Sequence, residues 1–452
     1  MKPFGRLTAA VSATLLLDGV LAATSGTFNI LAMNVAGLPA ILNDNGVLGD
    51  KADNAAAIGA KLAEYGYDVV QLQEDFNYHA HIYRTDNHPF RTATSGGVPF
   101  GSGLNTVSNF DWVDFRRIKW DKCSDASQFD CLTPKGFTFM RVAISAPAGN
   151  STAVYADFYN VHTDAGVEDG DFNARNSNVN EVAAYIAEWS QGNAVLVYGD
   201  LNSRYSREGD TAIRSLLASV NPTGPGLTDA WIELQHGGTI PSGQSACGNP
   251  AADNACEIVD KVFYRSSPLL TLQADTFRYD SQRFLQADGS ILTDHNPVLG
   301  DFSWSSGSAL QQSDFFGGDY GVWFSDVPAL ANLSRPKALT LTFRGGSRLD
   351  SVGLTLVDGT RFTHGGSGGT EVSLTLGPSE YWIEAELCRG EKRGKARNFY
   401  IQAVTSSGRS LAAGTATSDC ATFQAPDGWQ IVGFMGQDGD EMDQLAFVYA
   451  PQ

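Results

Sequence analysis

The pattern of apolar residues changes at one place along this chain of 452 residues, shortly after Trp304. Before that point, apolar runs of strand length alternate with segments whose apolar residues recur at helical spacing. The helical segments "NAAAIGAKLAEYG" and "NSNVNEVAAYIAEWSQG" precede the apolar runs "YDVVQLQE" and "NAVLVYGD", respectively. This alternation predicts a layered α/β domain over residues 24–304.

A polar stretch without periodicity, "SSGSALQQSD", follows Trp304, and we interpret residues 305–312 as a linker. Beyond it, short strand-like runs are separated by glycine turns, with hardly a helical pattern before the last residue. The 48 glycines and 17 prolines of the chain suit a protein with many turns. We therefore expect a second, all-β domain over residues 313–452.

Residues 1–23 have the organisation of a signal peptide: a basic start, a short apolar stretch and two alanines that offer a cleavage site. Asp18 interrupts the apolar stretch, so a first helix of the domain is the alternative. The stretch is too short to span a bilayer, and the rest of the chain has no apolar run of about 18 residues. We predict a secreted, extracellular protein. Sequons at Asn150 and Asn332 are compatible with a glycoprotein.

The chain has six cysteines, which suggests disulfide bonds in an exported protein. No CxxC or Cys/His spacing typical of zinc occurs among them. Two pairs each flank a short polar loop, and the remaining two cysteines are left for each other. Proximity thus favours Cys123 with Cys131, Cys247 with Cys256, and Cys388 with Cys420.

The composition is acidic, with 31 Lys and Arg against 50 Asp and Glu and a net charge of −19. A polyanion would have to be met by a local basic patch against an unfavourable overall field. The segment "FRRIKWDK" supplies a basic cluster, but a brief one compared with a stripe that tracks nucleic-acid phosphates.

Several strand-like runs of the first domain end in polar residues that could carry chemistry. Taken singly, an Asn after a strand caps a turn, and a Glu at a strand end is solvated. The recurrence of such residues along one domain favours a site at which the strand ends meet. The residues are Asn34, Glu74, His162, Asp200, Asn202, Asp294 and His295, together with Asp260 inside the strand-like "CEIVDKVFYR".

In this order, these residues resemble the motifs of the Mg-dependent endonuclease/exonuclease/phosphatase superfamily, over residues 27–304. The family includes deoxyribonuclease I, neutral sphingomyelinases and inositol-phosphate phosphatases. The resemblance implies a deoxyribonuclease I-like fold, in which two facing sheets form an α/β sandwich with the catalytic loops at one end. It also implies a metal-dependent phosphoric diester hydrolase.

Phosphodiester hydrolysis accounts for the residue types. Hard oxygen ligands from Glu74 and Asn34 suit Mg²⁺, with Glu74 as the leading ligand. By resemblance, His295 is the general base that activates water, and His162 donates a hydrogen bond to a non-bridging oxygen.

The remaining acidic and amide residues complete the predicted site. Asp200 and Asn202 are expected to position the water and the phosphate. Asp260 and Asp294 would orient the two imidazoles or lie near the metal. We place Asp294 with the metal ligands and Asp260 with the catalytic residues.

The second domain resembles the jacalin-type lectins over residues 313–452, through "GGDYGVWFSD", "FRGGSRLDSVGLTLVDGTRFTHGGSGG" and "GFMGQDGDEMDQLAFVY". The resemblance implies a β-prism with a sugar site made by an N-terminal glycine turn and a G-x-x-x-D loop. The alternative is that these glycines serve tight turns and that Asp443 is a turn cap. The predicted carbohydrate-binding residues are Gly318, Gly439, Asp440, Glu441 and Asp443.

Three functions follow: a phosphodiesterase targeted to glycans, a lectin with an inactive phosphodiesterase domain, or an adhesion protein in which both domains bind. The segment "CLTPKGF", residues 131–137, resembles one in secreted bacterial sphingomyelinases and favours a phospholipid diester over nucleic acid. A secreted endonuclease is the alternative enzyme. A lipid enzyme would contact a membrane surface transiently, and the candidate aromatic side chains are Phe76, Tyr78, Tyr83, Phe90 and Phe100.

Overall fold

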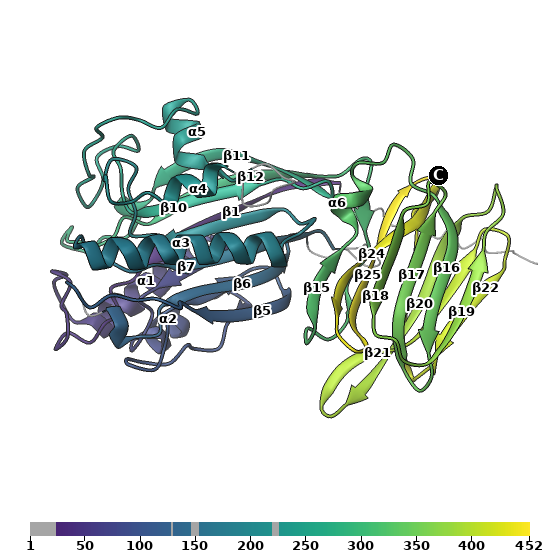
Figure 1. The fold of residues 1–452 in the computed structure, drawn as a ribbon. Coiled ribbons are helices and arrows are strands. Elements are labelled where there is room, and N and C mark those ends of the chain that lie inside the picture. Colours follow the sequence, from purple (N-terminus) through teal and green to yellow (C-terminus); the bar gives the residue numbers. More distant parts are fainter. Residues whose placement is uncertain (1–23, 128–129, 146–152, 219–225) are drawn as a thin grey trace, which may run out of the picture.

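The computed structural model describes residues 24–127, 130–145, 153–218 and 226–452. The predicted signal peptide and the sequon at Asn150 lie outside the described residues. The described chain forms two domains that lie side by side, an α/β sandwich followed by an all-β prism (Figure 1). The predicted fold class is therefore confirmed.

The N-terminal domain is built on two facing six-stranded sheets. The first sheet has the order β11 (Leu270–Tyr279), β12 (Val298–Ser306), β1 (Ser25–Asn34), β2 (Val69–Gln73), β4 (Asn105–Ser108) and β3 (Phe90–Arg91). The second has the order β5 (Trp112–Lys119), β6 (Gly136–Ala143), β7 (Tyr155–His162), β8 (Val195–Asp200), β10 (Asp260–Arg265) and β9 (Thr228–Asp229).

Helices cover the outer faces of both sheets. Apolar residues of α1 and α2 pack on the first sheet in one cluster, whereas those of α3 belong to the large core around the second sheet. The helices are α1 (Lys51–Tyr65), α2 (His79–Thr85), α3 (Asp169–Trp189), α4 (Ile213–Ala218) and α5 (Ala230–His236).

The two long helices begin earlier than their apolar periodicity predicts, because polar residues cap them. The side chain of Asp50 accepts hydrogen bonds from the first turn of α1. Glu168 and Asp171 form a capping box at the start of α3. Gly66 ends α1 in the left-handed conformation, with φ of 64°.

The C-terminal domain is a prism of three antiparallel sheets around its own core. The sheet next to the first domain contains β13 (Gln311–Gln312), β14 (Phe316–Gly317), β15 (Val322–Ser325), β24 (Trp429–Asp438) and β25 (Met442–Pro451). The second sheet contains β16 (Ala338–Gly345), β17 (Leu349–Leu356), β18 (Arg361–Gly365) and β19 (Thr370–Thr375). The third contains β20 (Trp382–Lys392), β21 (Lys395–Thr405), β22 (Ser410–Gly414) and β23 (Asp419–Gln424), and the short helix α6 (Val327–Leu330) follows β15.

The connection between the domains is shorter than the predicted linker 305–312. Ser305 and Ser306 belong to β12, and Gln311 and Gln312 pair with β25. Polar composition alone did not reveal these strands, because backbone pairing at a sheet edge needs no apolar side chain. The connector is thus confined to residues 307–310.

Specific contacts fix the two domains against each other. Arg116 of β5 donates to the carbonyl oxygen of Asp319 (2.9 Å) and to Gln437 (3.0 Å), both in the prism. The guanidinium of the buried Arg141 lies 3.5 Å from the ring centroid of Trp323. These contacts join β5 and β6 of the sandwich to the prism.

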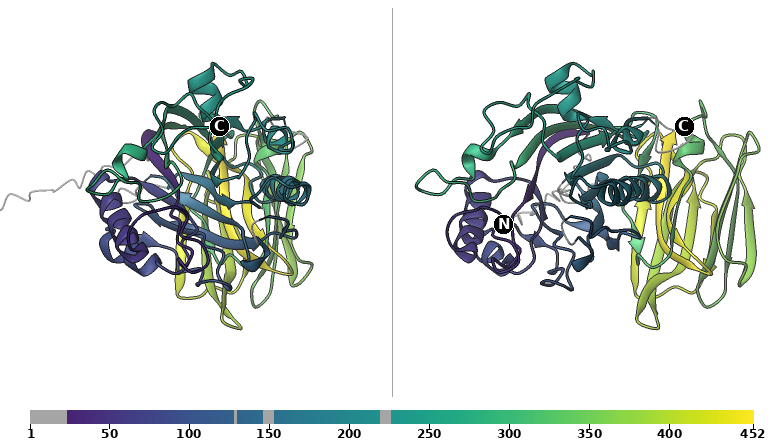
Figure 2. Two further views of the ribbon diagram at one scale, coloured as in Figure 1. Left: turned by 90° about the vertical axis from the view of Figure 1, so that its left-hand side faces the viewer. Right: turned by 60° about the vertical axis from the view of Figure 1, so that its left-hand side comes forward.

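The prism adjoins one end of the sandwich, and the predicted site lies at the other. Strand β7 begins at Tyr155, whose hydroxyl donates to Asp314 of the prism, and it ends at His162. Figure 2 shows the sandwich from two further sides, with the prism behind it or beside it. A ligand at the predicted site therefore faces away from the prism.

The three predicted disulfide pairs are confirmed: Cys123–Cys131, Cys247–Cys256 and Cys388–Cys420. Asn332, the second sequon residue, is exposed after α6. Among the described residues, no helix is both long enough and apolar enough to cross a bilayer.

Candidate active site

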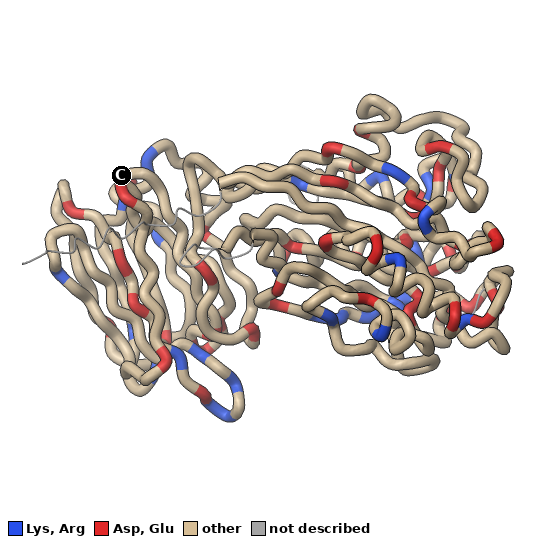
Figure 3. Tube along the Cα trace, turned by 180° about the vertical axis from the view of Figure 1, so that it is seen from behind, with Lys and Arg blue, Asp and Glu red and all other residues tan. Residues whose placement is uncertain are grey.

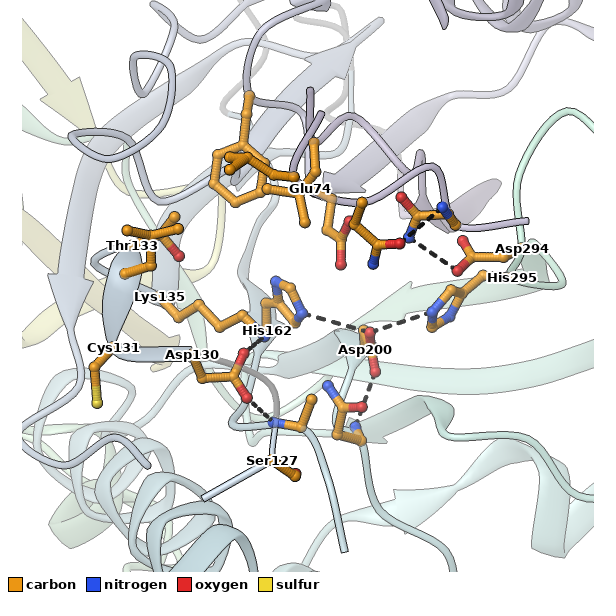
Figure 4. Close-up of a pocket in the computed structure, with 18 of the residues that line it drawn as sticks. Glu74, Ser127, Asp130, Cys131, Thr133, Lys135, His162, Asp200, Asp294 and His295 are labelled. Carbon is orange, nitrogen blue, oxygen red and sulfur yellow. Dashed lines mark hydrogen bonds and ion pairs between the residues drawn. The ribbon is translucent and has the colours of Figure 1, made fainter. Parts of the chain in front are cut away.

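An open cleft of about 1110 Å³ lies where strands of both sheets end. Its lining includes Glu74, His162, Asp200, Asn202, Asp294 and His295 (Figure 4). The strand register explains the convergence, because Asp200 is the direct partner of His162 on one side and of Asp260 on the other. Asn34 ends β1 on the facing sheet and donates to Asp200 (3.2 Å). The structure thus brings together all eight residues predicted for this site.

Two imidazoles flank one carboxylate at the floor of the cleft. Oδ2 of Asp200 lies 3.5 Å from Nε2 of His162 and 3.7 Å from Nε2 of His295. On its other side, Nδ1 of His295 contacts Oδ2 of Asp260 at 3.0 Å. Asp260 thereby orients the ring and leaves Nε2 directed towards the cleft. Asn202 donates its backbone N–H to Asp200 (2.9 Å) and completes the floor.

The electrostatic environment shifts the pKa values of the two histidines in opposite directions. Burial favours the neutral form of both rings, and for His162 the nearby Lys135 adds to this effect, so that its pKa lies well below the usual value. For His295, the carboxylates of Asp260 and Asp200 outweigh burial and raise the pKa well above the usual value. His295 is therefore the ring that gains a proton readily, and His162 is the neutral partner.

Glu74 is held in an unusual backbone conformation beside this floor. Its φ is +54°, in the left-handed region that disfavours side chains, and Phe76 donates its backbone N–H to the Glu74 carbonyl (2.9 Å). Gly37 lies directly against it: a Cβ added there would sit 2.3 Å from the Glu74 carbonyl oxygen. Two separate loops therefore fix where this carboxylate points.

The donor atoms around Glu74 fit a divalent cation. Oε2 of Glu74 and Oδ1 of Asp294 are buried without a hydrogen-bond partner among the described residues. Burial raises the pKa of Glu74, and the neighbouring Asp294 adds to this shift. A hard cation would balance both carboxylates, and the amide oxygen of Asn34 supplies a third donor of suitable chemistry, although it already accepts from the Ala36 N–H (3.0 Å).

A second donor set, formed by Asp200, Asp260 and His295, brings its ligand atoms within 4.8 Å of one another. These residues already contact each other through the histidine ring. We assign them to proton handling, because both carboxylates pair with a histidine ring. We assign the cation to the side of Glu74 and Asp294, whose carboxylates each have a buried oxygen without a partner and form no ion pair among the described residues.

Lys135 is a site residue that the sequence analysis missed, although it lies in the quoted segment "CLTPKGF". Its side chain lines the cleft and forms an ion pair with Asp130 (Figure 4). Burial disfavours its charge, but Asp130 and Glu74 outweigh burial and raise its pKa. The resemblance of the segment could have indicated it, because a lysine in an acidic cleft suits a phosphate oxygen.

In the prism, the predicted sugar residues are close together but differ in exposure. Gly318 donates its backbone N–H to the Asp443 carbonyl (2.9 Å), which joins the glycine turn to the G-x-x-x-D loop. Gly439 and Asp440 are exposed, whereas Glu441 and Asp443 are 5% and 3% exposed. Sugar binding at this loop stays a prediction.

Comparison with known families agrees with both halves of this description. Residues 47–245 match the family described as Endonuclease/Exonuclease/phosphatase family 2, and residues 313–448 match the Jacalin-like lectin domain. The chain joins an endonuclease/exonuclease/phosphatase domain to a jacalin-like lectin domain. The prism is called the lectin domain below.

Curated relatives match more than half of this chain. Proteins named sphingomyelinase from Mycobacterium bovis and Mycobacterium tuberculosis are 36% identical over 287 residues, which is 62% of this chain and 53% of theirs. The chain thus spans about half the length of the curated relatives that it matches.

Two solved structures are similar to parts of this chain. Beta toxin from Staphylococcus aureus, in a crystal structure with bound magnesium ions, is 15% identical, with a TM-score of 0.41, and covers 61% of this chain and 99% of its own. A mannose-binding jacalin-related lectin from Ananas comosus is 19% identical, with a TM-score of 0.28, and covers 32% of this chain and 99% of its own.

Proposed function

We propose that the protein is an exported, Mg²⁺-dependent phosphodiesterase that hydrolyses a sphingomyelin-like phospholipid. The observation that carries the proposal is the cleft floor, where Asp260, His295 and Asp200 form a proton-handling array beside the unbalanced carboxylates of Glu74 and Asp294. The three disulfides support export, because such bonds persist in oxidising compartments.

The array suits hydrolysis by a single attacking water. Nε2 of His295 accepts the water proton while Asp260 keeps Nδ1 as the donor, and the water oxygen bonds to phosphorus. The bond between phosphorus and the lipid alcohol oxygen breaks, that oxygen takes a proton from water, and the proton held by His295 returns to solvent. Neutral His162 and the Asn202 amide face the same space and can donate to phosphate oxygens. Lys135 adds a positive charge near His162 in the same cleft.

Glu74, Asp294 and Asn34 would hold the cation in this mechanism. When bound, it supplies positive charge that neutralises phosphate oxygens, supports the leaving oxygen and favours the neutral form of His295. The chain itself contributes the fixed carboxylate of Glu74, whose position two loops determine.

Apolar side chains at the rim of the cleft favour a lipid over a nucleic acid. Ile41 and Leu42, which line the cleft, are 94% and 53% exposed, and Leu132, which also lines it, is 47% exposed. Exposed aliphatic groups suit contact with acyl chains or a membrane interface, whereas they cannot donate hydrogen bonds to a phosphate backbone. The net charge of −19 also disfavours nucleic acid.

Most of the aromatic residues that the sequence suggested for membrane contact are not exposed. Phe76 is only 2% exposed, because it packs beneath the Glu74 loop against Gly103. Tyr78, Tyr83 and Phe90 are half-buried. Phe100 is 85% exposed and remains a candidate for membrane contact.

A substrate panel with and without Mg²⁺ tests the reaction. The protein should release phosphate monoester from sphingomyelin, lose this activity in chelator, and recover it when Mg²⁺ is restored. His295→Gln should lower turnover by about 10²–10⁴-fold, the usual scale for a lost general base. His81→Gln on α2, outside the cleft lining, is the matched control and should keep the wild-type rate.

The same panel separates the alternatives. Nicking of duplex DNA without lipid turnover would replace the lipid proposal by a nuclease. Absence of hydrolysis of any diester under these conditions would favour a lectin with an inactive partner domain.

The rim is tested separately on vesicles. Ile41→Ser with Leu42→Ser should reduce hydrolysis of sphingomyelin in vesicles about tenfold, because two exposed side chains can no longer enter the interface. The control pair, Leu339→Ser with Val357→Ser, removes two exposed aliphatic groups from the lectin domain and should not change the rate. Equal losses in both pairs would argue against a lipid-facing rim.

A further inference from the structure

The lectin domain contains a dense run of positive charge in an otherwise acidic chain. Residues 389–397, "RGEKRGKAR", include five arginines and lysines and one glutamate. They form the end of β20, a tight turn and the start of β21. We call residues 389–397 the basic hairpin. It projects from the lower edge of the prism in Figure 1, and its basic positions are visible in Figure 3.

The tip of the basic hairpin contains two features that disfavour its folding. Lys392 and Lys395 are direct partners across the two strands, which is an unfavourable place for like charges. Arg393 opens the turn with φ of 55°, a conformation that glycine or asparagine adopts more readily, and Gly394 follows with φ of 73°. Since these choices do not stabilise the hairpin, they point to a role for the exposed charges.

The acidic residues of the predicted sugar loop form ion pairs with two cations of this hairpin. Glu441 forms ion pairs with Lys392, with Arg397 (3.2 Å) and with Arg348 of a neighbouring loop. Asp443 lies 3.2 Å from Arg397. Buried carboxylates need such partners, and the pairing turns both side chains inward. Glu441 and Asp443 therefore position cations rather than face solvent.

Two cations at the tip remain for an outside ligand. Arg393 and Lys395 are exposed, and neither forms an ion pair with a carboxylate of the described chain. The ammonium of Lys395 lies 4.9 Å from the ring centroid of Tyr320, next to the glycine turn. A Cβ added to Gly318 would lie 2.6 Å from the Ala396 carbonyl. Hairpin, glycine turn and sugar loop thus form one continuous surface.

We propose that this surface binds a glycan that carries an acidic group, such as a sulfate ester or a uronic acid carboxylate. Arg393 and Lys395 pair with the acidic group, because charge-assisted hydrogen bonds to an anion are stronger than neutral ones. The exposed Gly439–Asp440 backbone and the glycine turn face the neighbouring hydroxyls. The inference concerns the lectin domain alone and does not depend on the proposed hydrolysis.

The distribution of charge favours an acidic glycan over an anionic membrane. Glu391 and Asp440 are exposed next to the cations, so the surface alternates in sign over a short distance. Such alternation suits one anionic group flanked by hydroxyls, whereas binding to an anionic bilayer relies on several uninterrupted cations.

The experiment compares two double variants of the full-length protein. Arg393→Gln with Lys395→Gln removes the tip charges without touching the ion pairs of Glu441. Arg335→Gln with Arg361→Gln removes two exposed arginines elsewhere on the lectin domain and changes the net charge equally. Binding is measured at physiological ionic strength to a heparin fragment, to the same fragment after desulfation, to a neutral mannoside, and to phosphatidylserine-containing vesicles.

Wild type should bind the sulfated fragment, and the tip variant should bind it about tenfold or more weakly, while the control variant stays within about twofold. Equal weakening in both variants would reduce the effect to net charge and overturn the proposal. Binding to the mannoside as tight as to the heparin fragment, or binding to the vesicles only, would overturn it as well. Hydrolysis of sphingomyelin in detergent micelles should be the same for wild type and both variants. If the glycan proposal fails, the proposed hydrolysis is therefore unaffected.

Discussion

Glu74 in the cleft and Glu441 in the lectin domain have opposite environments, although the sequence marks both as candidates for ligand binding. In the cleft, Glu74, Asp260 and Asp294 each have a buried carboxylate oxygen without a hydrogen-bond partner among the described residues. In the lectin domain, Glu441 forms ion pairs with Arg348, Lys392 and Arg397.

The difference shows which carboxylates depend on something from outside the chain. Burial raises the pKa of Glu74, and the cations of the chain do not compensate. Burial acts on Glu441 too, but hydrogen bonds from Arg348 and Lys392 outweigh it and lower the pKa. A carboxylate left unbalanced by its own fold is suited to an external cation, whereas a balanced one supports structure.

The strongest test of this comparison is Glu74→Gln. We expect at least about a hundredfold loss of phosphodiester hydrolysis, because a cation ligand worth several kcal/mol to the transition state is removed. The free energy of unfolding of the metal-free protein should not decrease, since the substitution removes an unbalanced buried charge. Hydrolysis kinetics and denaturant unfolding in chelator measure the two effects.

Glu64→Gln is the matched control for that experiment, because Glu64 is exposed on α1. It should change neither the rate nor the stability. If Glu74→Gln retained the rate, the assignment of the cation to this residue would be wrong.

Glu441→Gln should give the reverse result. Neutralising Glu441 leaves its three cations without their shared partner, so the lectin domain should lose on the order of 1–3 kcal/mol of stability. Hydrolysis at the distant cleft should not change. Glu371→Gln, which breaks only the exposed pair with Arg344, should cost less than about 1 kcal/mol. Equal losses in thermal unfolding would contradict the difference between the two sites.

Asp114, at the domain interface, lies between these extremes. Its Oδ2 accepts from Gln437 (2.7 Å), whereas Oδ1 is buried 3.5 Å from Arg116, and burial raises its pKa to about 6. Because the folded pKa is above the unfolded value of about 3.9, ionisation of Asp114 disfavours folding as the pH rises through about 6.

Asp114→Asn should therefore gain stability relative to wild type between pH 4 and pH 7.5, by about 1–3 kcal/mol. Thermal unfolding of both proteins across this pH range gives the difference. A difference that does not change with pH would show that Arg116 and Arg141 balance the carboxylate fully.

The positions of the cleft residues could be predicted because strand ends impose them. Asp200 ends a completely buried strand, and His162 ends its parallel neighbour. When a polar side chain follows such a run, the register of the sheet determines which other strand ends it meets. The order of these residues along the chain, which resembles the motifs of the endonuclease/exonuclease/phosphatase superfamily, therefore carried most of the information about this site.

Lys135 and the basic hairpin could not be predicted in the same way, because their environment comes from distant segments. Lys135 pairs with Asp130, which belongs to the loop closed by Cys123 and Cys131, and it lies near the carboxylates of Glu74 and Asp200 from other segments. The aromatic residues suggested for membrane contact show the same limit, since composition does not tell that Phe76 is buried and Ile41 exposed.

The sequence by itself determined the two domains, their order, the disulfide pairs and the residues that meet at the cleft, because local periodicity, turn residues and strand ends are properties of short segments. Only the tertiary structure decided which carboxylates remain unbalanced and which are paired. Glu74 and Glu441 are both acidic residues that the sequence marks as candidates for ligand binding, and they differ in the cations that folding brings to them from distant parts of the chain. Pairing energies and burial depend on those distant partners, which no local pattern records.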